Sequence, residues 1–335
     1  MRPPRNFYAR TFQRDAGMLS RVASNLYWMS RYLERAEHTA RLLDVELQLW
    51  LDQSPEVGAG RWRFLVDALQ IRGIQGRLDP LELAEALVFS RESFSSIVSC
   101  VAAARENLRY VREQCSSEMW EQLNKLYLQV IERRPEKGWI LKSHELFRSV
   151  QEGAHLFQGI TDATMSHGEG WQFIQLGRYV ERSDTLAALL DTHFDRAAQP
   201  ADQPVDSGEY LSWVGLLRGC AAFEAYCQAH TAEIRPLRVA EFLILNPDLP
   251  HSIRFSVDRM NAALHLIGDL TERREKTPSR IAGRLRAKLS FSQIEEIMAG
   301  GVAAYLRSVR SECAQIHDAI HQIYFDYSVE AELVS

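Results

Sequence analysis

The chain contains one fifteen-residue pattern twice, and this repeat constrains the fold more than any other feature of the sequence. The first copy runs from Ser30 to Asp44 and the second from Gly177 to Asp191, with no gap in either copy. Eight residues are identical at a constant separation of 147 positions, and charged and aromatic residues are among them. In the first copy they are Arg31, Tyr32, Glu34, Arg35, Ala40, Leu42, Leu43 and Asp44. Such identity at fixed spacing indicates an internal duplication.

Weaker matches follow in the same order along the chain. Trp62 corresponds to Trp213, residues 83–89 to 239–245, and residues 147–150 to 306–309, at separations of 151, 156 and 159 positions. Separations that rise steadily are what one duplication followed by small loop insertions would leave. We therefore expect a single domain over 18–335, made of two repeats (18–165 and 168–325) that are related by a pseudo-two-fold axis.

Hydrophobic periodicity predicts an all-α fold. From Met18 to Asp52 apolar residues recur at steps of three and four, which indicates a long amphipathic helix, and the segment from Trp171 to Arg196 repeats it. Alternating runs and hairpin turns typical of strands are nearly absent. The patterns predict about twelve helices in a duplicated bundle. Pro55 and the run Gly58-Ala59-Gly60 are expected to form a loop after the first helix.

Composition excludes several classes of protein. A net charge of −5 argues against nucleic-acid binding, which needs a basic face. No window approaches 18 uninterrupted apolar residues, so we expect no membrane span. Five scattered cysteines without a C-x-x-C pair are typical of reduced thiols in a cytoplasmic protein. Residues 1–17 are basic and lack apolar periodicity, so we expect a disordered N-terminal extension.

The strongest candidate site is the pair of Glu-Arg dipeptides. Adjacent residues of a helix point about 100° apart, so Glu34 cannot face Arg35 and each needs a partner elsewhere. Two-fold packing would pair Glu34 with Arg182 and Glu181 with Arg35. These charges either fix the register of a helix contact or line a cleft for an anionic or peptide ligand. The neighbouring candidates in the same stretches are Arg31, His38 and Arg178.

Other chemistry has weaker support in the sequence. His167, Glu169 and Trp171 form a polar cluster at a helix start, which is either a secondary site or an N-cap. Glu152 and His155 make a single Glu-x-x-His element, whereas a di-iron bundle needs two, so we expect no metal. Phosphate-binding loops and nucleophile motifs are missing, so we expect no cofactor and no catalytic activity of this chain alone.

Two segments resemble motifs of a known family. The stretch from Met18 to Glu37 resembles the opening of the bacterial Alpha-E superfamily, and the stretch from Gly168 to Arg182 resembles its second motif. The resemblance covers 18–325. Members of that family begin at the equivalent of Met18, so residues 1–17 depart from its pattern.

The resemblance implies a set of partners. Genes of that family neighbour, or are fused to, a circularly permuted ATP-grasp protein, and a transglutaminase-like peptidase and a proteasome-like hydrolase occur in the same clusters. ATP-grasp enzymes join a carboxylate to an amine. The resemblance therefore implies an accessory subunit that helps to present a peptide or amino-acid substrate to the ligase. The alternatives are an enzyme that uses the Glu-Arg cleft for acid–base chemistry and a plain scaffold.

Deleting residues 1–17 is expected to leave the melting temperature unchanged, because the segment has no apolar face to pack on the helices. Thermal unfolding of the full chain and the shortened chain measures this. A drop of more than a few degrees would show that the segment packs on the body.

Overall fold

The computed structural model describes residues 18, 20–51, 55–71, 79–133, 138–196, 202–231, 233–271 and 276–326. Within these ranges the chain is all-α, as predicted, with no strand. Residues 1–17, and the disorder expected for them, lie outside the described residues.

The first half contributes six α-helices: α1 (Ser20–Leu51), α2 (Pro55–Ala68), α3 (Pro80–Phe89), α4 (Ile97–Tyr110), α5 (Ser117–Ile131) and α6 (Ser143–Thr164). The second half contributes eight: α7 (Glu169–Arg196), α8 (Ser207–Gly219), α9 (Phe223–His230), α10 (Pro236–Leu245), α11 (Ile253–Thr271), α12 (Thr277–Phe291), α13 (Ile294–Gly300) and α14 (Val302–Ile320). A short π-helical turn, His321–Phe325, follows α14.

One sequence prediction about these helices is wrong, and the expected number of helices is slightly low. The described residues hold fourteen α-helices and not about twelve, because α9 and α13 are each only about two turns long and too short to show a helical period. The loop expected at Pro55 and Gly58–Gly60 is instead the first part of α2. Proline fits the first position of a helix, where its missing amide would have no helical partner. A glycine in a helix costs only about 1 kcal/mol, which neighbouring packing can offset.

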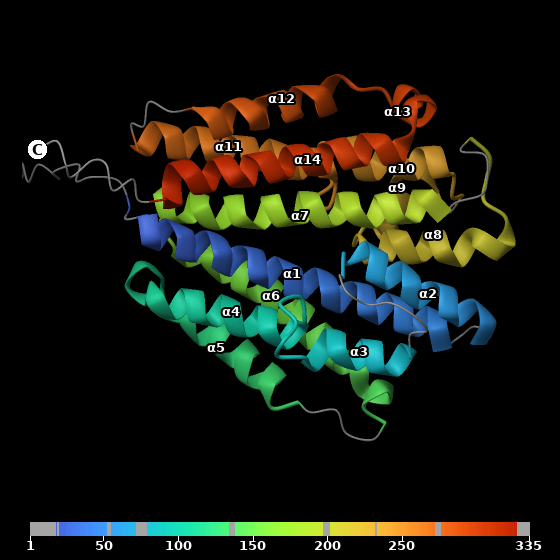
Figure 1. Cartoon of the computed structure of the whole chain (residues 1–335), viewed down its shortest axis with the longest axis horizontal. Coiled ribbons are helices and arrows are strands. Elements are labelled where there is room, and N and C mark those ends of the chain that lie inside the picture. The colour runs from blue at the N-terminus through green and yellow to red at the C-terminus, as the bar shows by residue number, and fades with distance from the viewer. Residues whose placement is uncertain are drawn as a thin grey trace, which may run out of the picture.

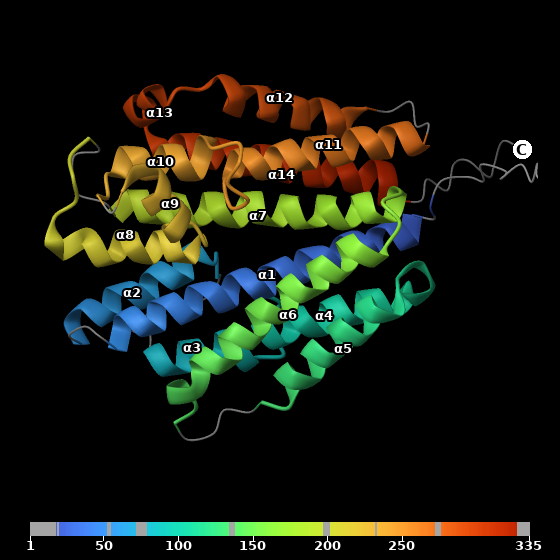
Figure 2. The same ribbon diagram turned by 180° about the vertical axis from the view of Figure 1, so that it is seen from behind.

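Helices α1 and α7 lie side by side through the middle of the molecule, and each is covered by helices of its own half (Figures 1 and 2). Helix α1 packs against α4 and α6, with α5 behind them. Helix α7 packs against α11 and α14, with α12 behind them. Helices α2 and α8 cross between the halves, because α2 also contacts α7 and α8 contacts α1.

This packing has the same order in both halves, which agrees with the repeat. The partners α3, α4, α5 and α6 of the first half correspond in sequence to α10, α11, α12 and α14. The two-fold rotation that would relate the halves stays a prediction.

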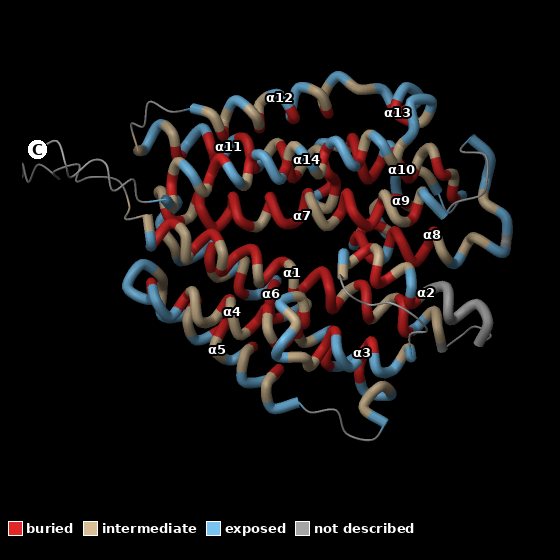
Figure 3. Tube along the Cα trace, viewed as in Figure 1, coloured by how far each residue is buried: buried red, intermediate tan, exposed pale blue. Residues whose placement is uncertain are grey.

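The core follows the two central helices. Buried residues run along most of α7 and along α1 (Figure 3). Helix α7 is buried on nearly all sides because α1, α2, α11 and α14 surround it. Trp62 and Trp213, matched by the repeat, are both buried core residues. None of the helices in the described ranges combines the length and the apolar composition that crossing a bilayer requires.

The crossing of α1 and α7 is close because of one glycine. A Cβ atom on Gly177 would lie 2.3 Å from the carbonyl oxygen of Tyr27 and 3.2 Å from the Cβ of Ser30. The first of these neighbours is backbone and cannot move aside without shifting α1. Ser30 is the residue that the repeat matches to Gly177, so two small residues meet where the central helices cross.

Substituting Gly177→Ala is expected to destabilise the fold by about 1–3 kcal/mol, the usual cost of overpacking a well-packed core. Gly159→Ala is the matched control, because Gly159 lies within α6 and a Cβ there would meet nothing within 4 Å. The control should be neutral or stabilising by up to about 1 kcal/mol. Urea unfolding of both variants tests this, and equal stability of the two would contradict the close approach.

Candidate functional site

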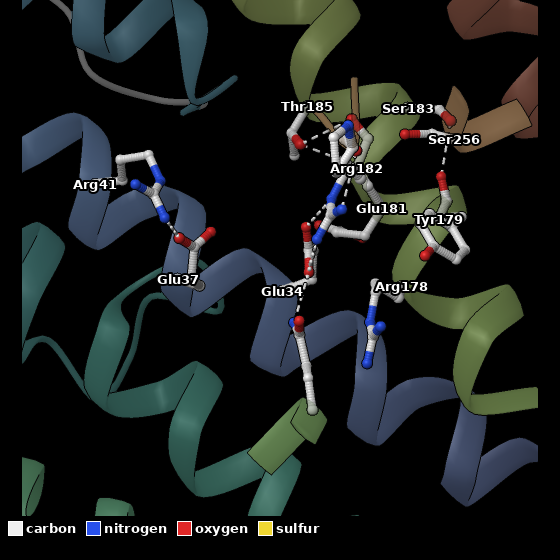
Figure 4. Close-up of polar contacts among 12 residues, drawn as sticks. Glu34, Glu37, Arg41, Arg178, Tyr179, Glu181, Arg182, Ser183, Thr185 and Ser256 are labelled. Atoms are coloured by element: carbon white, nitrogen blue, oxygen red, sulfur yellow. Dashed lines mark hydrogen bonds and ion pairs between the residues drawn. The ribbon is translucent and has the colours of Figure 1, made fainter. Parts of the chain in front are cut away.

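Two Glu-Arg ion pairs cross the contact between α1 and α7, as the repeat predicted. Glu34 accepts hydrogen bonds from Nε and Nη2 of Arg182 at 2.5 and 3.0 Å (Figure 4). Glu181 accepts from Nε and Nη2 of Arg35 at 2.6 and 3.1 Å. Both carboxylate side chains are 3% exposed. Each arginine thus holds its acid through two parallel bonds, the strongest geometry of such a pair.

Arg31 adds a third bond that the other half does not repeat. Its Nε donates to Glu181 at 2.7 Å, and its guanidinium lies over the ring of Trp28 at 4.9 Å. Arg178, the matching residue on α7, donates instead to Gln175 at 3.3 Å. Its Nε has no hydrogen-bond partner among the described residues, and burial lowers its pKa. The site is therefore asymmetric although its motif is repeated.

These contacts keep Glu181 ionised. Burial acts to raise its pKa, but the charges and hydrogen bonds of Arg31 and Arg35 outweigh burial and lower the pKa from 4.5 to about 2. A general acid or base works best with a pKa near the operating pH. Glu181 is therefore suited to holding two arginines in place and poorly suited to proton transfer at neutral pH.

A second polar cluster lies beside the Glu34–Arg182 pair and was not predicted as a site. Buried Glu37 accepts a hydrogen bond from Arg41 (Figure 4) and lies 3.6 Å from Nε2 of His155. Burial opposes ionisation of Glu37, but Arg41 and His155 lower its pKa. The sequence did hold a signal for this acid, because Asp184 occupies the matching position of the second repeat.

Among the predicted site residues, His38 has a buried ring nitrogen, Nε2, that makes no hydrogen bond to the described residues. The side chain is 6% exposed, and this nitrogen has no partner within the described parts of the chain. Burial lowers the pKa of His38, so the ring is neutral at physiological pH. A buried nitrogen of this kind can accept from, or donate to, a bound molecule.

Sequence reasoning also missed a contact between the start of α1 and the end of α14. The hydroxyl of Tyr27 lies 2.8 Å from Nδ1 of His317, and the two rings stack. Burial raises the pKa of Tyr27 to about 12 and, with the charge of Arg31, lowers the pKa of His317 to about 3. No repeated residue marks this contact, because the position matching Tyr27 is Ile174.

The secondary candidates lie elsewhere. His167 stacks on Trp171 with ring centroids 4.2 Å apart, and Glu169 accepts from the backbone amide of Met18 at 2.9 Å. Glu169 precedes Glu181 by twelve residues, or about 18 Å of helix. The structure does not bring these three residues to the Glu-Arg pairs. Glu169 instead ties the start of α7 to Met18, which lies two residues before α1.

The two residues of the Glu-x-x-His element separate as well. Glu152 pairs with Arg148 at the surface, whereas His155 lies beside Glu37. Across the described ranges, no group of three or more His, Cys, Asp or Glu side chains is arranged to hold a metal ion.

Replacing Glu34 by Gln is expected to destabilise the fold by about 3–5 kcal/mol, because Arg182 keeps its charge in a buried place without a carboxylate. Glu152→Gln is the matched control, since the Glu152–Arg148 pair is mostly exposed and should contribute at most about 1 kcal/mol. Urea unfolding at neutral pH measures both. Losses of equal size would mean that the Glu34 pair is energetically a surface pair.

The lowered pKa of Glu181 predicts a defined acid sensitivity. Its folded pKa of about 2 lies below the ordinary 4.5, so the stabilisation is fully present above about pH 4.5 and is lost as the pH falls toward 2. The stability gap between the parent protein and Glu181→Gln should therefore shrink across this interval. Urea midpoints from pH 7 to pH 2 measure the gap, and a gap that stays constant would contradict the assignment.

Proteins of two mycobacteria are similar to this chain in sequence. Uncharacterised proteins of Mycobacterium bovis and Mycobacterium tuberculosis are each 25% identical to this chain over 328 residues. The match covers 90% of this chain but 36% of each relative, so the chain spans about a third of the length of the relatives it matches. No solved structure matches the chain.

One sequence family covers nearly the whole chain. It is described as a predicted α-helical domain with a conserved ER motif, and it matches residues 18–325. Glu34-Arg35 and Glu181-Arg182 both fit that motif, and they supply the four side chains of the crossed pairs. With the all-helical fold, this match shows that the chain belongs to the Alpha-E family.

Proposed function

We propose that this protein is a non-catalytic partner unit of an amide-bond-forming system, and that it helps an ATP-grasp ligase to receive an amino-acid or peptide substrate. The non-catalytic role is supported by the hydrogen bonds within the repeated Glu-Arg motif, which already occupy both of its carboxylates. Glu34 and Glu181 each receive two hydrogen bonds from one arginine, and Glu181 receives a third from Arg31. Residues occupied in this way hold α1 to α7 and leave bond formation to another protein.

The alternative enzyme would use the same acids for proton transfer. That role needs a carboxyl group with a raised pKa in a ligand-accessible place. The lowered pKa of Glu181 argues against it. The geometry therefore favours a binding role over acid–base catalysis.

The length of the relatives supports a partner role. In the mycobacterial proteins the matching region is 36% of the chain, so it is joined covalently to a longer polypeptide. A helical unit that works beside an enzyme is suited to such fusion. The class of that enzyme, a circularly permuted ATP-grasp ligase, comes from the family resemblance of the two motifs. A transglutaminase-like peptidase and a proteasome-like hydrolase are further partners on the same ground.

The test is ADP release by the neighbouring ATP-grasp protein, measured with and without this protein across a panel of free amino acids. The proposal predicts that addition of this protein raises turnover for a subset of the panel. Glu152→Gln should act like the parent protein, because Glu152 is exposed on α6 and its neighbour Arg148 is its ion-pair partner.

Two outcomes would contradict the proposal. Complex formation without any change in turnover would indicate a plain scaffold. Conversion of a substrate by this protein alone, lost in Glu34→Gln at unchanged stability, would indicate the enzyme.

A further inference from the structure

A cavity of about 240 Å³ lies on the Glu181 side of the crossed pairs. Its walls come from α1, α7, the end of α2 and the loop before α4. Among the lining residues are Arg35, His38, Ser95, Glu181, Asp184 and Ala188. The cavity thus borders Arg35 and Glu181, one residue from each dipeptide of the motif, and His38 is also among its lining residues.

At the matching positions on the Glu34 side, the repeat carries larger side chains. The repeat aligns Ala188 with Arg41 and Ser95 with His251, at separations of 147 and 156 positions. Arg41 bonds to Glu37, and burial together with the charges of Arg182 and Arg41 lowers the pKa of His251, against the opposing charge of Glu37. One side of the motif therefore carries two large side chains where the other carries an alanine and a serine.

The walls of the cavity offer free groups of both charges. Arg35 uses Nε and Nη2 on Glu181, and Nη1 has no bond among the described residues. Asp184 accepts from Nε of Arg310 through Oδ1 at 3.0 Å, which leaves Oδ2 for another donor. A cation on α1 and an anion on α7, both lining the cavity, suit a small molecule that carries a carboxylate and an ammonium group.

The rim of the cavity is held in a set position. Gln70 follows the end of α2 with a left-handed backbone, φ 55°, and its side-chain oxygen accepts from Nη1 of Arg310 at 3.1 Å. A non-glycine residue in this conformation is uncommon. Arg310 thereby donates hydrogen bonds to both Gln70 and Asp184, two of the residues that line the cavity.

The volume limits the size of the occupant. Pockets for drug-sized ligands measure about 300–1,000 Å³, so about 240 Å³ fits a smaller metabolite. We infer that this cavity binds a free α-amino acid, with its carboxylate toward Arg35 and its ammonium toward Asp184. The inference rests on the proposed function, since it names the substrate class that the partner unit would present.

Calorimetric titration of the full chain with L-alanine, L-serine, L-glutamate and L-lysine tests the ligand class. At least one of them should bind, and its N-acetyl and methyl-ester derivatives should bind at least about tenfold more weakly, because each lacks one charge-assisted contact. Equal binding of the derivatives, binding of acetate or phosphate alone, or no binding of any probe would overturn the inference.

Two substitutions copied from the Glu34 side test the location. Ser95→His and Ala188→Arg each place the larger side chain of the other repeat into the cavity, and each should abolish binding. Glu92→His is the matched control for the first, because it adds the same side chain at an exposed position of the same loop. Should Ala188→Arg fail to fold, Ser95→His decides alone. Retained binding in a folded Ser95→His protein would overturn the site.

These titrations use this protein by itself, so they separate the inference from the proposed function. Amino-acid binding without any effect on the ligase would contradict the proposed function but would support the inferred binding site. A ligase effect that persists in Ser95→His would contradict the site and keep the function.

Discussion

The crossed ion pairs between α1 and α7 are the interaction on which the rest of the structure depends. Glu34 and Glu181 are almost fully buried, and removing an ion from water costs several kcal/mol even after the protein relaxes. Each acid recovers this cost through a guanidinium on the opposite helix. Neither half can therefore bury its own motif favourably without the other, so we expect residues 18–165 and 168–325 to fold as one unit.

The pairs need the close approach that small residues provide. Gly177 lets the backbone of α7 reach that of α1 beside Tyr27 and Ser30. Arg35 and Arg182, which lie five residues after Ser30 and Gly177, can then reach the opposite acid with two bonds each. The two repeats also differ in the side chains that lie beside the motif. The repeat places Arg41 and His251 at the positions that match Ala188 and Ser95, and Ala188 and Ser95 line the cavity.

The sequence was sufficient to predict what the repeat encodes. Two copies of a Glu-Arg dipeptide on two helices, packed about a two-fold axis, have one natural pairing, and both predicted pairs are present. The repeat could not predict what only one copy contains. The bond of Arg31 to Glu181, the place of His251 and the stacking of His317 on Tyr27 depend on tertiary packing that the matching residues Arg178, Ser95 and Ile174 do not reproduce. Pro55 was misread because the same residue begins a helix as readily as it ends one.

A double-mutant cycle on Glu34 and Arg182 tests most directly whether the crossed ion pairs hold α1 to α7. Glu34→Leu, Arg182→Met and the double variant are compared with the parent protein by urea unfolding at pH 7. Each single change leaves one buried charge alone and should cost about 3–5 kcal/mol, whereas the double change removes both charges. The double variant is expected to lose at least about 2 kcal/mol less free energy of unfolding than the two single losses added together. If the single losses simply add, Glu34 and Arg182 do not stabilise each other, and the crossed pairs do not hold α1 to α7.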